Sequence, residues 1–224
     1  MKILKSVLSA IGILVILIIV GSKIFHYFVN KKQEEVAQKL EKVMQYERKN
    51  YEIKLKEGYK AMQEGNYTKA RLLFKDICKN ATIFNMPEGC FNLGIMYLNG
   101  FGVDKNLSKA ELYFKKSAEI GLIDAYGFLS YINSINGNEK KALNNAKKGC
   151  ELNSAYSCFM AGAFYYDGDI VERNLTASKQ YWKKALSLLP TARMPEKQKD
   201  KEELKNLMCS AIPNLCDSNL TKRQ

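Results

Sequence analysis

The sequence predicts an all-α protein, an α/α solenoid of tandem helical hairpins preceded by an N-terminal transmembrane helix. Three observations lead to this fold class. Apolar residues at three- and four-residue spacing over 89–99 and again over 107–118 indicate two helices joined by a turn at Gly100 and Gly102. Related patterns recur about every 36 residues along the chain. A long apolar run lies near the N-terminus.

Residues 1–30 are expected to form a membrane anchor or a signal sequence. Lys2 and Lys5 precede the apolar run, and residues 7–29 supply the roughly 20 apolar residues that a spanning helix needs. We favour an uncleaved single-pass anchor, because the apolar run continues past the candidate cleavage site at residues 20–22. Cleavage at that site would instead release the rest of the chain from the membrane.

The segments that flank the repeats are more polar. Residues 31–54 predict a charged lead-in helix, in which three apolar residues between 36 and 43 form a stripe too short for a coiled coil. Residues 190–224 predict a linker, a capping helix that ends near Cys209, and a polar tail. Residues 55–189 between them hold the hairpin repeats.

Two registers define the second helix of each hairpin. Where two helices must approach closely, one register carries a small residue: Ala70, Ala110, Ala142 and Ser178. Four residues further on, a second register carries mostly large apolar residues that fill a groove: Phe74, Phe114, Ala146 and Trp182. This alternation of small and large positions is typical of stacked hairpins.

The same residues resemble a known family. The stretch 92–103, Asn-Leu-Gly-Ile-Met-Tyr-Leu-Asn-Gly-Phe-Gly-Val, is similar to the Sel1-like repeat, and 161–168 begins a second good copy. Residues 124–129 look like a degenerate copy, and 58–74 resemble the related tetratricopeptide repeat. Cysteines near the helix ends resemble those of the cysteine-rich secreted Sel1-like proteins of Helicobacter- and Campylobacter-type bacteria. The resemblance implies a solenoid over about residues 55–190.

Six cysteines lie beyond the N-terminal segment, and all are expected to form disulfides. Equivalent positions in two hairpins hold a cysteine at the end of one helix and another at the start of the next, side by side across the turn. The expected pairs are Cys78–Cys90 and Cys150–Cys158, with Cys209–Cys216 following by exclusion. Disulfides imply an oxidising compartment.

The sequence offers little catalytic chemistry. His26 is the only histidine and lies in the N-terminal apolar segment, which argues against a histidine-dependent catalytic dyad or metal site in the repeats. No Ser-x-x-Lys or Lys-Thr-Gly motif is present. We therefore expect no metal and no cofactor, and catalytic residues stay unassigned. A net charge of +12 favours anionic partners, but no nucleic-acid-binding motif accompanies it.

We interpret the chain as an interaction module at the bacterial inner membrane, anchored through residues 7–29, with its repeats in the periplasm. The expected partner is a periplasmic protein, a peptide or a peptidoglycan component. Tyr156 and Tyr166 are the candidate binding residues, because they lie off the repeat register on the first helices. The family resemblance supplies an alternative, binding or hydrolysis of β-lactams, since some cysteine-rich relatives are described in that way. A secreted or periplasmic protein without an anchor is the alternative location.

Sequons with an acidic residue two positions before the asparagine suggest bacterial N-glycosylation. They occur at four positions: Asn66, Asn106, Asn174 and Asn219. The first three share a repeat register with Asn138, where a helix N-cap is also expected, so capping is an alternative explanation for them. Asn219 lies in the polar tail and is expected to be the most accessible acceptor.

Overall fold

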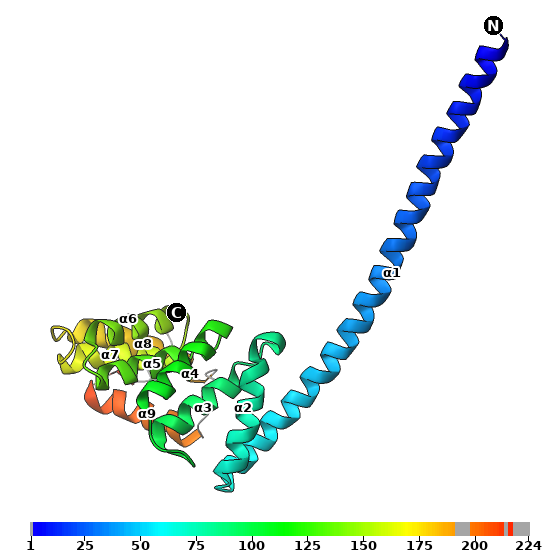
Figure 1. Ribbon diagram of the computed structural model, residues 1–224. Helices are drawn as coiled ribbons and strands as arrows, with labels where there is room; N and C mark the ends of the chain where they lie inside the picture. Colours follow the sequence, from blue (N-terminus) through cyan, green and yellow to red (C-terminus); the bar gives the residue numbers. More distant parts are fainter. Residues whose placement is uncertain (1, 191–197, 213–214, 217–224) are drawn as a thin grey trace. The chain divides into compact units, whose positions relative to one another are not determined.

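The computed structural model describes residues 2–190, 198–212 and 215–216. These residues form helices and connecting turns, with no strand among them (Figure 1). The helices are α1 Lys2–Gln63, α2 Tyr67–Phe84, α3 Glu88–Asn99, α4 Leu107–Ile120, α5 Ala125–Ile135, α6 Glu139–Glu151, α7 Ala155–Asp167, α8 Leu175–Leu188 and α9 Gln198–Ala211. The chain divides into two compact units, Met1–Glu52 and Ile53–Gln224.

The first unit belongs to α1, and it corrects the predicted transmembrane helix. In the described part of the chain, no helix is both long enough and apolar enough to cross a membrane. The apolar run at 7–29 continues without a break into a polar stretch of the same 62-residue helix, where Val36 and Leu40 are 59% and 60% exposed. The prediction of a single-pass inner-membrane anchor at residues 7–29 is therefore wrong, and so is the location based on it.

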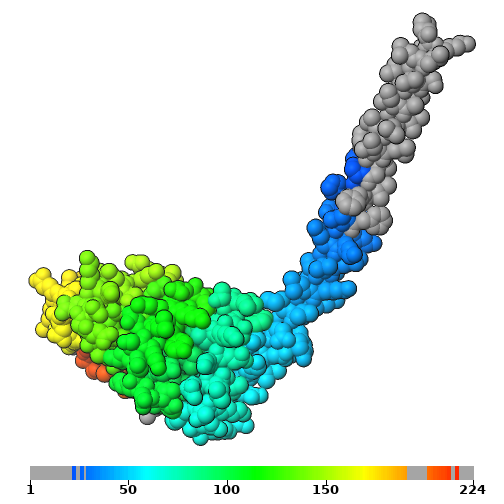
Figure 2. All heavy atoms as spheres, viewed as in Figure 1, coloured from blue at the N-terminus to red at the C-terminus, as the bar shows by residue number. Residues whose placement is uncertain are grey.

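The residues that the structure describes in the second unit form four helical hairpins and a final helix. Residues 53–63 of α1 pack against α2, and the following hairpins are α3–α4, α5–α6 and α7–α8. The colours of this unit follow one another from cyan through green to yellow, as successive hairpins stack in chain order (Figure 2). The prediction of an all-α stack of hairpins is confirmed.

A glycine on the first helix packs against an aromatic ring on the second in three of these hairpins, the first pair being Gly58 and Phe74. In α3–α4, a Cβ atom at Gly94 would lie 2.8 Å from the Phe114 ring. In α7–α8, a Cβ atom at Gly162 would collide with the Trp182 indole. Phe114 is fully buried and Trp182 is 4% exposed, so the ring has no other place to move. The contact is therefore an interlock that requires glycine at this position.

The α5–α6 hairpin solves the same packing problem with small residues. Ala146 replaces the aromatic residue of the second helix, and Ser130 stands on the facing helix, both at 0% exposure. The Ser130 hydroxyl donates a hydrogen bond to the carbonyl oxygen of Ala142 at 2.9 Å. This bond satisfies the buried hydroxyl, which would otherwise destabilise the core. The degenerate copy in the sequence thus keeps the hairpin geometry.

The glycine-rich turns are built in the same way in α3–α4 and α7–α8. Gly100 and Gly168 end their first helices in the left-handed conformation, at φ 79° and 81°. The second helix then starts at an asparagine, whose side-chain oxygen accepts a hydrogen bond from the backbone N–H three residues later. This bond measures 2.9 Å at both Asn106 and Asn174. The predicted N-caps are therefore present at these turns.

Three disulfides clip the second unit, between Cys78 and Cys90, Cys150 and Cys158, and Cys209 and Cys216. These are the pairs expected from the sequence. The first two join consecutive helices across a turn, with Cα atoms 4.5 Å apart and each cysteine no more than 3% exposed. The third differs, because one of its two cysteines, Cys216, is exposed.

Helix α9 packs on the last hairpin. Met208 is fully buried and Leu215, just beyond the helix, is 6% exposed, and both belong to the apolar cluster that contains Trp182. In this way α9 covers apolar surface that a further hairpin would otherwise cover. The Cys209–Cys216 disulfide closes a small loop at the C-terminal end of α9, since the two cysteines are seven residues apart.

Candidate functional site

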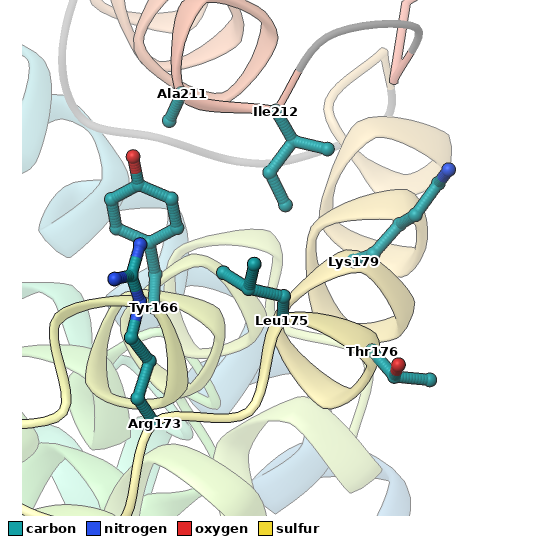
Figure 3. A pocket seen from close by; sticks show the side chains of 7 residues that line it. All are labelled: Tyr166, Arg173, Leu175, Thr176, Lys179, Ala211 and Ile212. Carbon is teal, nitrogen blue, oxygen red and sulfur yellow. The ribbon is translucent and has the colours of Figure 1, made fainter.

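A pocket of about 310 Å³ lies where the last hairpin meets the end of α9 (Figure 3). The end of α7, the following turn, the first turn of α8 and the end of α9 all contribute to its wall. Its lining residues are Tyr166, Arg173, Leu175, Thr176, Lys179, Ala211 and Ile212. Figure 3 shows Ala211 and Ile212 on one side of the space, facing Tyr166 and Leu175 on the other.

The local sequence explains why these side chains converge. Asn174 caps α8, so Leu175 and Thr176 occupy the first turn and Lys179 follows one turn later, on the same face as Leu175. The first N–H groups of a helix have no acceptor within it, and they carry the positive end of the helix dipole. The α8 terminus therefore adds a preference for negative charge to this wall of the pocket.

Arg173 supplies a positive charge next to an aromatic surface. Its guanidinium lies 5.5 Å from the centroid of the Tyr166 ring, which in turn lies 5.3 Å from the Trp182 ring. Trp182 is fixed by its indole N–H, which donates to the Phe159 carbonyl oxygen at 3.0 Å. This chain of contacts holds the Tyr166 side of the pocket in place before any ligand arrives.

The turn beside the pocket is acidic, and it acts on Arg173. Partial burial and the nearby Asp169 raise the pKa of Asp167, while Arg173 lowers it. The charge of Arg173 is thus partly balanced through space. Even so, neither Arg173 nor Lys179 takes part in an ion pair among the residues that the structure describes. Both cations therefore stay available to a negatively charged ligand.

The opposite side of the pocket is apolar. Ile212 and Ala211 come from the end of α9, and Leu175 adds apolar surface from the first turn of α8. A space with two cations and three apolar side chains favours a ligand that carries a negative charge next to an apolar group. In the described ranges, no group of three histidine, cysteine or acidic residues is placed to hold a metal ion.

Comparison with known proteins identifies the repeats. Residues 87–122 and 155–188 match the family described as Sel1 repeat, and the two segments coincide with the α3–α4 and α7–α8 hairpins. The chain therefore contains Sel1 repeats. A stretch of 52 residues is 40% identical to the Helicobacter pylori protein named "Putative beta-lactamase HcpC". That match covers 23% of this chain and 17% of HcpC, so it concerns a small part of both proteins.

One solved structure supports the fold. A protective antigen of uropathogenic Escherichia coli strains, which displays an SLR fold, superposes with a TM-score of 0.51 at 19% identity. The alignment covers 75% of this chain and 43% of the antigen, so this chain spans less than half of that protein. A Sel1 repeat protein from Oxalobacter formigenes aligns with a TM-score of 0.49 at 13% identity, over 62% of this chain and 61% of that one.

The structure separates the two tyrosines proposed as binding residues. Tyr166 lines the pocket. Tyr156 lies instead in the row of core aromatic rings, with its ring centroid 5.0 Å from that of Phe128 and 6.3 Å from that of Phe159. Both tyrosines are half-buried. The structure therefore gives Tyr156 a packing role and leaves Tyr166 as the candidate contact residue.

The two Sel1 repeats differ at positions that line the pocket, and this difference could have indicated the site from the sequence. The turn of the first repeat has Lys105 where the second has Arg173, and Glu111 where the second has Lys179. Glu111 pairs with Lys115 at 2.8 Å. The reversal of charge at Lys179 marks the last hairpin as the one suited to an anion. The residues of α9 carried no comparable signal, because no repeat register extends to them.

The candidate glycosylation sites at the turns serve as helix caps. Asn66, like Asn106 and Asn174, accepts a backbone hydrogen bond through its side-chain oxygen. Asn219 lies outside the described residues. Capping uses the amide oxygen, whereas a glycan is attached to the amide nitrogen, so the two roles are compatible. Glycosylation at these four positions stays a prediction.

Proposed function

We propose that this Sel1-like protein is a non-catalytic interaction module, and that it binds a segment of a partner protein in the pocket at its last hairpin. The pocket carries the proposal, because Arg173 and Lys179 present positive charge above apolar walls in a space that fits part of a chain. The disulfides support an oxidising location, and a secreted or periplasmic protein fits them.

The rigidity of the site supports binding of a flexible segment. The Cys150–Cys158 disulfide joins α6 to α7, and Lys184 of α8 donates to the Cys150 carbonyl oxygen at 2.7 Å. These links hold the helices of the last hairpin in register. A site that is already ordered loses little entropy on binding, so more of the contact energy appears as affinity.

The experiment that tests this function is a peptide-binding screen on the purified, oxidised full chain. A displayed library of random peptides is selected against the wild-type protein, and hits are measured as fluorescein-labelled synthetic peptides by polarisation. Arg173→Gln and Lys179→Gln are the test variants. Lys183→Gln is the matched control, because Lys183 is exposed on the same helix and does not line the pocket.

We expect hits whose affinity falls about tenfold or more in each test variant, because a charge-assisted pair is worth more than the ~1.4 kcal/mol that a factor of ten represents. The control variant should change affinity by less than about twofold. Hits that bind all variants equally would contradict a site at this pocket. A screen without hits would contradict the interaction function itself.

β-Lactam hydrolysis is the remaining alternative, and the name of HcpC is what brings it to this chain. It is tested by incubating the metal-free full chain with a chromogenic β-lactam. We expect no turnover above background, because no serine or zinc motif for this reaction occurs in the sequence. Saturable turnover that a single Asp or Glu substitution abolishes would replace the interaction function with an enzymatic one.

A further inference from the structure

The chemistry of the pocket also indicates which part of a partner chain it takes. Arg173 and Lys179 line the same space as Leu175 and Ile212, and the pocket volume is about 310 Å³. That space is too narrow for a helix, whose diameter with side chains is about 10–12 Å. The occupant is therefore an extended stretch of one or two residues that places a negative charge beside an apolar side chain.

Two positions on a polypeptide can offer a carboxylate, and they differ in what surrounds it. An aspartate or glutamate inside a chain needs backbone leaving on both sides and carries no apolar group on the same residue. The last residue of a chain carries its free α-carboxylate and its side chain on one Cα atom, and its backbone leaves in one direction only. The α9 end closes one side of the pocket, opposite Tyr166 and Leu175 (Figure 3). This closure favours a chain end.

We infer that the pocket binds the C-terminus of a partner polypeptide that ends in an apolar residue. The free carboxylate lies at the first turn of α8, within reach of Arg173 and Lys179, and the last side chain packs between Leu175 and Ile212. Arginine suits this role, because its planar guanidinium can donate two parallel hydrogen bonds to one carboxylate. The inference rests on the proposed function, because it names the ligand of that same site.

The first Sel1 repeat suits a carboxylate less well. Its equivalent position has Glu111 in place of Lys179, and the negative charge of Glu111 opposes a carboxylate. The pocket at the last hairpin has Lys179 at this position, so a partner C-terminus meets no such repulsion there.

The test compares chain ends on the oxidised full chain. A library with six randomised residues and free C-termini is selected against the protein, and each hit is synthesised with a free carboxylate and with a C-terminal amide. We expect hits that end in an apolar residue, and a loss of about tenfold or more on amidation. The same loss is expected in Arg173→Gln and Lys179→Gln, whereas Lys183→Gln stays within about twofold of wild type. Added salt should weaken binding of the free carboxylate more than binding of the amide.

The outcomes separate this inference from the function beneath it. Hits that depend on Arg173 and Lys179 but bind equally well as amides would overturn the C-terminal assignment and leave a peptide-binding pocket. Hits that ignore all three substitutions, or a library that yields none, would overturn both. Far-UV circular dichroism of each variant checks its fold, and Ile212→Ser provides a second route, because it removes part of the apolar wall of the pocket without adding a charge near the cations.

Discussion

Asp124 shows how one residue can set the pH dependence of a fold. Its side chain is 8% exposed and accepts a hydrogen bond from the Ser154 hydroxyl at 2.8 Å. Burial raises the pKa of this carboxyl above its ordinary value of 3.8, and the bond from Ser154 opposes that rise in part. The residues are 30 positions apart and start two successive first helices, α5 and α7. Sequence reasoning missed the pair, because Asp124 opens the degenerate copy at 124–129 and nothing in the sequence links it to Ser154.

The first prediction concerns this carboxyl. The folded state holds its proton more tightly than the unfolded state, so stability falls as the pH rises from about 3.8 through the raised pKa. Asp124→Asn keeps an oxygen that accepts from Ser154 and removes the buried charge. We expect the variant to be more stable than wild type at neutral pH, with the difference shrinking towards acidic pH. Urea unfolding across this range measures it, and a constant difference would be contrary to the assignment.

The second prediction concerns the interlock of glycine and ring. Gly162→Ala places a methyl group against the Trp182 indole and is expected to lower the free energy of unfolding by about 1–3 kcal/mol, as overpacked cores do. The control is a double-mutant cycle with Trp182→Leu. In the smaller background the alanine should be tolerated better, so the two changes should not add. Additive losses in urea unfolding would mean that the methyl group meets something else.

Among the helices, the N-caps of the repeats give a matched comparison. Asn174 accepts a hydrogen bond from the N–H of Ala177, whereas Asn138, at the equivalent place before α6, makes no side-chain capping bond. The sequence register placed both asparagines correctly but did not distinguish them. Backbone conformation alone does not explain the difference, because Asn66 has nearly the same φ and ψ as Asn138 and still accepts a capping bond from the N–H of Lys69.

The third prediction follows from that comparison. Asn174→Ala should lower the free energy of unfolding by about 1 kcal/mol, the usual loss for an N-cap. Asn138→Ala, the control, should change it by only a few tenths. Urea denaturation of both variants at one pH provides the values. Equal losses would show that the asparagines act through something other than the capping bond.

For the whole molecule, the sequence predicted the hairpins and the pairs Cys78–Cys90 and Cys150–Cys158 because both follow a repeat, whereas Cys209–Cys216 followed by exclusion. The small residue at Ala110 and the large one at Phe114 determine how the two helices of a hairpin pack. The same pattern in the other hairpins strengthens the prediction. Among the residues that line the pocket, the sequence analysis identified only Tyr166 as a candidate binding residue. The rest of the pocket wall depends on how α9 folds back onto the last hairpin, and Ile212 belongs to no repeated pattern. The predicted membrane span is wrong, because no helix in the described part of the chain is both long enough and apolar enough to cross a membrane.

The fourth prediction concerns the disulfide beside the pocket. Ala211 and Ile212 lie inside the loop closed by Cys209 and Cys216, and Cys216 is exposed, whereas the Cys150–Cys158 bond is buried. Increasing dithiothreitol should therefore release the thiols of Cys209 and Cys216 first. Alkylation and mass spectrometry identify them, and peptide affinity should fall while far-UV circular dichroism is retained. Simultaneous release of all six thiols would contradict this order.

The removal of the buried bond gives the contrasting, fifth prediction. Cys150→Ala with Cys158→Ala opens a loop of eight residues and should lower the free energy of unfolding by about 2.5 kcal/mol in the chain-entropy picture. Cys209→Ala with Cys216→Ala opens a loop of nearly the same length and should lower the free energy of unfolding by a similar amount, but it should lower peptide affinity more, because Ala211 and Ile212 lie inside that loop. Thermal melts and polarisation on both double variants separate the effects, and a reversed pattern would assign the bonds the opposite roles.

All the residues that line the pocket lie between positions 166 and 212, in the last hairpin and α9. In the hairpins before them, the two helices pack through the small and large residues of their own repeat. A lineage could therefore duplicate or delete an upstream hairpin without redrawing the pocket, and could change the pocket without rebuilding the stack. The number of hairpins and the ligand preference of the pocket can therefore evolve independently of each other.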